Sequence, residues 1–100
     1  MLFESIFGNK VSCDFVLWHP QHFPFGAIVE CKAQYRSGSV DEKIPYLYLN
    51  IIERSPCPTV IVYGGDGIRG AVVKWMRRKV DHHKLLGVFE LEGFEAFLSR

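Results

Sequence analysis

A short apolar run, TVIVY at residues 59–63, constrains the fold more than any other segment. β-Branched and aromatic residues favour strands, and a strand without a polar face is typical of the centre of a sheet that is covered on both sides. Apolar residues recur with helical spacing before this run, over residues 41–54, and after it, over 68–82. The pattern therefore predicts an α/β fold with a mixed sheet flanked by helices.

The remaining elements follow from the same rules. The proline-rich stretch 19–26 (HPQHFPFG) predicts a turn that joins two antiparallel strands. Ser39 is the expected N-cap of the 41–54 helix, with Glu42 as its capping-box partner. Further strands are expected over 11–18, 27–34 and 85–89, and short helices over 2–7 and 93–100. With 100 residues, 48% of them hydrophobic, we expect one domain spanning 1–100.

Cysteine usage indicates a reducing environment. Cys13, Cys31 and Cys57 are widely spaced, and they form neither a CxxC pair nor an even disulfide set. Cys13 and Cys31 lie in apolar runs, where a reduced cysteine is expected to pack as a small hydrophobe. A cytoplasmic location is therefore expected. No apolar run approaches the length of a membrane span, and the N-terminal residues, with acidic Glu4, do not resemble a signal peptide, so no membrane partner is expected.

Charged residues interrupt two of the apolar strands. Asp14 lies in the first strand, and Glu30 and Lys32 lie two residues apart in the next, so these two share a face. Hard cations such as Mg²⁺ take oxygen ligands, which the two carboxylates and the backbone carbonyl of Cys31 offer. Phosphodiester hydrolysis needs such a metal and an activated water, which Lys32 would orient or deprotonate. A solvated Glu30–Lys32 strand pair without function is the alternative, although charges within apolar strands are costly to bury.

This arrangement resembles the PD-(D/E)xK nuclease superfamily. In that pattern an acid opens one strand and the next strand carries acid-x-Lys, the positions that Asp14 and Glu30-Cys31-Lys32 take here. The flanking runs DFVL, AIVECKAQ and SGSVDEKIPY are also similar, and the resemblance covers residues 11–80. It implies a restriction endonuclease-like core with a mixed four-stranded sheet. It also implies a DNA endonuclease that depends on Mg²⁺, with Mn²⁺ as a substitute and no small-molecule cofactor.

The same resemblance implies accessory residues. Gln34 and Lys43 are candidates in the segment after the acid-x-Lys strand, and Glu4 is the candidate for an acid supplied by an N-terminal helix. The chain departs from the pattern in one respect, because Cys13 stands where the proline of the motif is expected. Since proline is not a ligand, this departure leaves the expected metal ligands in place.

A basic helix is the expected DNA contact. Lys74, Arg77 and Arg78 share one helical face, which we expect to hold DNA phosphates, although an ordinary solvated face explains the pattern equally well. The net charge of +1 neither supports nor excludes a DNA partner. A domain of this size presents one site, so cutting both strands of a duplex favours a symmetric homodimer.

Other functions stay open at this point. A Holliday-junction-resolvase-type nuclease and a catalytically inactive DNA-binding or assembly module are both compatible with the same fold. A nucleotide-binding protein would use the GGDG turn at residues 64–67, but no P-loop lysine accompanies it. The four histidines lack cysteines at zinc-ligand spacing, so a structural zinc site is not expected.

Overall fold

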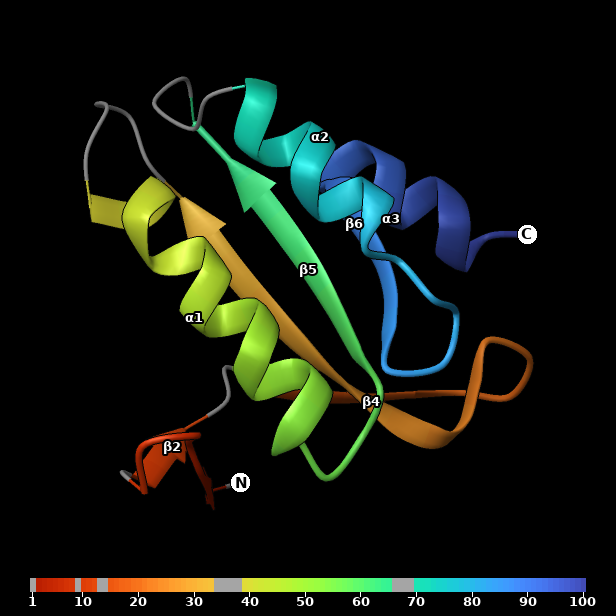
Figure 1. Cartoon of the computed structure of the whole chain (residues 1–100). Helices are drawn as coiled ribbons and strands as arrows, with labels where there is room; N and C mark the ends of the chain where they lie inside the picture. Colours follow the sequence, from red (N-terminus) through yellow and green to blue (C-terminus); the bar gives the residue numbers. More distant parts are fainter. Residues whose placement is uncertain (1, 9, 13–14, 34–38, 66–69) are drawn as a thin grey trace.

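The computed structural model describes residues 2–8, 10–12, 15–33, 39–65 and 70–100 (Figure 1). Within them, a four-stranded sheet has the strand order β3-β4-β5-β6, and β1 and β2 form a separate small sheet. The elements are β1 (Leu2–Glu4), β2 (Lys10–Ser12), β3 (Phe15–His19), β4 (Phe23–Ala33), α1 (Ser39–Glu53), β5 (Thr59–Gly64), α2 (Gly70–Arg78), β6 (Leu85–Glu90) and α3 (Leu91–Leu98).

The larger sheet is mixed, as the sequence predicts. β3 and β4 are antiparallel, whereas β4, β5 and β6 run parallel to one another. Parallel neighbours need a crossover connection, and α1 and α2 supply the two crossovers. The central position predicted for residues 59–63 is confirmed, because β5 lies between β4 and β6 and its Val60 and Ile61 are almost fully buried.

The two faces of this sheet are covered by different helices (Figure 1). On the face of α1 and α2, helix and strand side chains form what we call the aliphatic cluster: Ile44, Ile51, Ile61, Met76, Leu85 and Val88. On the α3 face lies what we call the aromatic cluster: Phe23, Ala27, Val29, Val60, Val62 and Phe94, with Leu17, Leu86, Phe89, Phe97 and Leu98 packed against it. On α1 and α2 the buried residues, Ile44 with Ile51 and Val73 with Met76, recur at the spacing of one helical face, as the sequence predicts for these two helices.

The N-terminal segment departs from its prediction. Residues 2–7 do not form a helix, because β1 pairs with β2 in antiparallel register, Leu2 opposite Ser12. A six-residue segment is too short to sustain a helix without strong packing, and the left-handed backbone of Gly8 (φ 84°) turns the chain back instead. The segment is fixed on α1, where Ile6 N–H donates to Asn50 Oδ1 over 2.9 Å.

Other boundaries shift by a few residues. The predicted 19–26 turn is shorter, since β3 includes His19 and β4 already begins at Phe23. The predicted 11–18 strand is divided between β2 and β3. α2 ends at Arg78 rather than at 82. Beyond the end of α2 the chain turns, and Asp81 Oδ1 accepts the backbone N–H groups of three residues in this turn and at the start of β6: His83, Lys84 and Leu85.

Candidate functional site

Glu30 and Lys32 lie together near the carboxyl end of β4. Glu30 is 7% exposed, and Lys32 Nζ lies 3.8 Å from Glu30 Oε2. Their register partners on β5 are Ile61 and Tyr63, so both side chains lie on the face covered by α1 and α2. An ion pair with a partly exposed lysine adds only about 0–1 kcal/mol to stability. The pair therefore contributes little to the stability of the fold.

The residue between them departs from its prediction. Cys31 is exposed rather than packed as a small hydrophobe. It alternates with Glu30 and Lys32 along β4, so its side chain lies on the opposite face of the sheet. The aromatic cluster that covers that face includes Ala27 and Val29 but does not extend to Cys31. The backbone carbonyl of Cys31 keeps its place between the two charged residues.

Asp14 and Gln34, two of the predicted site residues, lie outside the described residues. The residue next to Asp14 in the chain is described: Phe15 of β3 pairs with Val29 of β4. Val29 in turn is the chain neighbour of Glu30. The antiparallel pair thus brings the sequence neighbours of the two expected carboxylates into register.

Two residues that the sequence does not single out stand beside Lys32. Tyr63, the register partner of Lys32, is itself paired with Glu90 of β6. Tyr63 Oη accepts a hydrogen bond from Arg77 Nη2 (3.0 Å) and donates to Glu90 Oε1 (3.4 Å). Lys32, Tyr63 and Glu90 thus form a row across the carboxyl ends of three parallel strands, the edge at which α/β proteins commonly bind ligands. We call this the strand-end row.

The electrostatics of the row centre on Tyr63. Burial raises the pKa of its hydroxyl above the ordinary value of 10.0, the Arg77 guanidinium opposes that shift, and Glu90 adds to it. Arg77 also lies over the Tyr63 ring, with the guanidinium carbon 5.8 Å from the ring centroid. Tyr63 therefore keeps its proton and anchors Arg77 beside the strand ends.

The other predicted residues occupy the surface. Lys74, Arg77 and Arg78 are all exposed on α2, and Arg77 is the one that reaches the strand-end row. Lys43 is exposed on α1. Glu4 is exposed on β1, in the two-stranded sheet beside the C-terminal half of α1, whereas the carboxyl end of β4 lies near the start of α1 (Figure 1).

The donor chemistry of the site suits a hard divalent cation. Glu30 supplies carboxylate oxygens within a strand, and Cys31 supplies a backbone carbonyl oxygen. Among the residues that the structure describes, no three His, Cys, Asp or Glu side chains gather as metal ligands. Asp14 lies outside the described ranges, so the proposed donor set combines one described carboxylate with one that is not described.

Comparison with known families decides the assignment. A family model described as PD-(D/E)XK nuclease superfamily domain matches residues 1–100. The chain belongs to this superfamily. A search of the curated proteins and a search of the solved structures each found no significant match. The mixed four-stranded sheet and the helices α1–α3 are compatible with the restriction endonuclease-like fold of the PD-(D/E)XK proteins, and the resemblance predicted from the sequence is confirmed.

Membership of the superfamily indicates the general kind of function. PD-(D/E)XK proteins are generally nucleases, they typically use divalent metals, and they interact with nucleic acid. The acid-x-Lys segment Glu30-Cys31-Lys32, singled out in the sequence, lies within the matched residues. No helix in the described ranges is long and apolar enough to cross a membrane.

Proposed function

We propose that this PD-(D/E)XK protein is a Mg²⁺-dependent DNA endonuclease, built as one domain over residues 1–100, with Mn²⁺ as a substitute metal. The observation that carries the proposal is the buried Glu30 carboxylate with Lys32 Nζ 3.8 Å away, on one face at the carboxyl end of β4. A carboxylate and an amine held on a rigid strand are the groups that this chemistry needs. A cytoplasmic location fits the widely spaced cysteines.

Asp14 and Glu30, with the backbone carbonyl of Cys31, would hold the metal. The pairing of Phe15 with Val29 supports this set, because those two residues are the chain neighbours of the carboxylates. When bound, the ion neutralises charge on the phosphate and lowers the pKa of a bound water. Gln34 and Lys43 are proposed as accessory residues. Glu4 is a weaker candidate, since the helix expected to present it is a strand.

The remaining steps fall to the side chains of the chain itself. Lys32 orients the attacking water, or accepts its proton, and its ammonium form stabilises the phosphate as charge develops. Arg77, held by Tyr63, stands at the next strand end and binds a phosphate oxygen. Lys74 and Arg78 extend this contact along the DNA backbone without reading its sequence. Cutting both strands of a duplex would use a symmetric homodimer.

A nucleotide site at the GGDG turn is disfavoured by charge. The cavity beside Gly64 and Gly65, about 440 Å³ in volume, is also lined by Glu90 and Glu92. Carboxylates at its wall repel phosphate groups. Residues 66–69, which include the rest of the turn, lie outside the described residues.

The proposal is tested with three substrates and two variants. Supercoiled plasmid, linear duplex and a four-way junction are incubated with Mg²⁺ and the wild type, Lys32→Ala or Arg54→Ala. Arg54 is exposed at the end of α1 and serves as the matched loss of a cation. We expect Lys32→Ala to lose about 100-fold or more in cleavage rate and Arg54→Ala to cut normally. Equal cutting by the wild type and Lys32→Ala would overturn the mechanism, and a strong preference for the junction would favour the resolvase alternative.

A further inference from the structure

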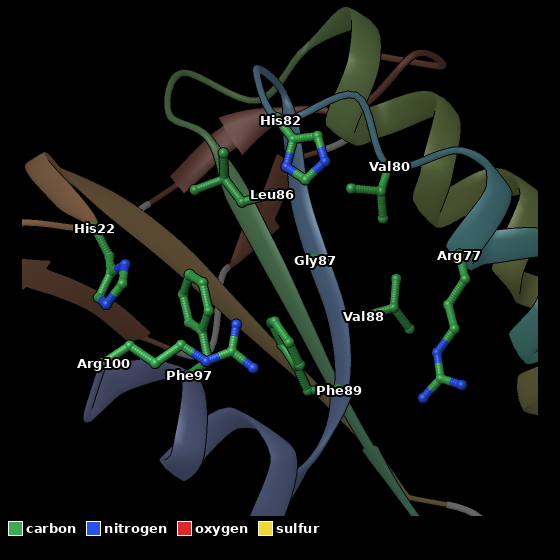
Figure 2. A pocket seen from close by; sticks show the side chains of 10 residues that line it. All are labelled: His22, Arg77, Val80, His82, Leu86, Gly87, Val88, Phe89, Phe97 and Arg100. Carbon is green, nitrogen blue, oxygen red and sulfur yellow. The ribbon is translucent and has the colours of Figure 1, made fainter.

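A second concave site lies away from Glu30 and Lys32, along the free edge of the sheet (Figure 2). The cavity has a volume of about 570 Å³, and we call it the β6 groove. β6 is the last strand of the four-stranded sheet among the described elements, and its residues 86–89 line the groove. Residues of α2 and the following turn lie on one side, and Phe97 of α3 with Arg100 lies on the other.

Charge in the groove has one sign. Arg77 and Arg100 stand on opposite sides of it, with His22 and His82 elsewhere on its wall (Figure 2). Of the described residues, no aspartate or glutamate lines the groove. Both arginines are exposed, so their guanidinium groups are accessible to a ligand. Two forked donors on either side of one cavity suit an anionic ligand with more than one charge, such as a chain of phosphates.

Between the arginines the wall is aromatic. Phe89 and Phe97 stack with ring centroids 5.1 Å apart, and the His22 ring lies 4.3 Å from the Phe97 ring at a tilt of 36°. Both phenylalanines are only partly buried although they pack against the aromatic cluster. Partly accessible aromatic rings beside cationic groups are the pattern of surfaces that bind single-stranded nucleic acid, where bases stack and phosphates pair with arginine.

Two details indicate a preformed site. Gly87 lies at the floor of the groove, and a Cβ at this position would lie 2.5 Å from the Phe89 ring, so any larger residue would displace that ring. The turn that carries His82 is held by the Asp81 carboxylate, whose Oδ1 accepts the backbone N–H groups of the three residues after His82. A wall whose position is fixed before binding loses little entropy when a ligand enters.

One polar atom of the groove wall lacks a partner. Nε2 of His22 is buried and makes no hydrogen bond to any described residue. A buried nitrogen without a partner is unfavourable. Because Nε2 is inaccessible from the groove, a ligand could bond to it only after the His22 ring rotates.

We infer that the β6 groove binds a single-stranded segment of nucleic acid. One base lies against the rings of Phe89 and Phe97, and the flanking phosphates pair with Arg77 and Arg100. Arg77 lines this groove and donates a hydrogen bond to Tyr63 of the strand-end row, so a strand in the groove continues toward Lys32. The inference rests on the proposed function in one respect, the choice of nucleic acid as the ligand. Its test measures binding and requires no cleavage.

Binding is measured on the full chain with Lys32→Ala, in EDTA, so that hydrolysis does not interfere. The probe is a fluorescent thymidine hexanucleotide, with an abasic hexamer of equal charge as its partner, read by fluorescence anisotropy. We expect the abasic hexamer to bind about tenfold more weakly, because the stacking contribution is lost. Adding Arg100→Glu should weaken binding about fivefold or more, and Arg54→Glu, an equal charge change outside the groove, by less than about twofold.

A residue-level measurement guards against indirect effects. In amide NMR spectra the hexamer should shift the signals of Gly87 and Val88 more than those of α1.

Equal affinity for the two hexamers, or equal effects of Arg100→Glu and Arg54→Glu, would overturn the inference. Sedimentation that shows a dimer broken by Arg100→Glu, without hexamer binding, would overturn it too and assign the edge to a second copy. Cleavage that fails in the wild type while the hexamer binds would refute the proposed function and leave the groove intact.

Discussion

The two faces of the central sheet bury different chemistry. On the α3 face the aromatic cluster is apolar throughout, and its rings lie close together, with Phe89 5.8 Å from Phe94 and 5.1 Å from Phe97. The face of α1 and α2 has an equally apolar aliphatic cluster, but at the carboxyl end of β4 it gives way to Glu30 and Lys32. The interior of the first face stabilises the fold, whereas the second gives up part of its apolar contact for charged groups, as functional sites do.

The largest expected effect tests the stability of the aromatic face. Phe94 is 7% exposed, and Phe94→Ala removes a buried ring, so the free energy of unfolding should fall by about 3–5 kcal/mol. Urea denaturation measures the loss. Leu91→Ala, an exposed position on the same helix, is the control and should change stability by less than about 0.5 kcal/mol. A loss no larger than that of the control would show that the cluster does not stabilise the fold.

Glu30→Gln tests the opposite expectation on the other face. The amide keeps the shape of the side chain but removes its charge, so cleavage should fall about 100-fold or more. Stability should stay within about 1 kcal/mol of the wild type, because the partly exposed Lys32 stays hydrated when its partner is neutral. Plasmid cleavage and urea denaturation are measured together, with the exposed Glu53→Gln on α1 as control. A variant that unfolds readily yet cuts normally would reverse the comparison.

A smaller effect is expected at the strand-end row. Tyr63→Phe removes the hydroxyl that accepts a hydrogen bond from Arg77, and Arg77→Ala removes the cation itself. Each should raise the KM for DNA, Arg77→Ala by about fivefold, and Arg77→Ala should also lower the slope of log affinity against log salt by about 1. Cleavage kinetics measure the KM, and salt-dependent binding of a duplex measures the slope. An unchanged slope in Arg77→Ala would remove this arginine from the DNA contact.

The smallest effect concerns the titration of Tyr63. Since burial, and secondarily Glu90, raise its pKa in the folded state against the opposing effect of Arg77, the folded chain retains this proton at a pH where the unfolded chain loses it. The associated stability is complete below pH 10.0 and is lost as pH rises through the folded pKa. Tyrosinate absorbance of the wild type minus Tyr63→Phe should titrate above pH 10.0. A difference curve centred below that value would contradict the burial argument.

Local patterns predict the elements that are long or uniformly apolar. Ile44 and Ile51 repeat with the helical period on α1, and the run 59–63 leaves no polar face, so both were open to prediction. β1 was not, because three residues carry too little periodicity, and it is held by pairing with β2 and by the bond of the following Ile6 to Asn50 on α1. Such tertiary contacts outweigh local propensity in short segments.

The residues of the site also divide into those that the sequence predicts and those that only the structure brings together. Spacing along one strand is enough to place Glu30 and Lys32 on one face. Tyr63, Arg77 and Glu90 come together only through the strand order, since their contacts span 14 and 27 residues of sequence. The predicted strand 59–63 ends at Tyr63, and Glu90 follows the predicted strand 85–89 directly, so a comparison of parallel strand ends would have brought both residues to attention.

Metal binding tests the central claim most directly. Calorimetric titration of the wild type with Mg²⁺, and with Mn²⁺ as the substitute, is compared with Asp14→Asn, Glu30→Gln and the control Glu53→Gln. The proposed site predicts that the wild type and the control bind either ion and that Asp14→Asn and Glu30→Gln each lose this binding. If neither ion binds the wild type, or if both site variants bind as tightly as the control, Asp14 and Glu30 do not form a metal site and the proposed nuclease mechanism fails.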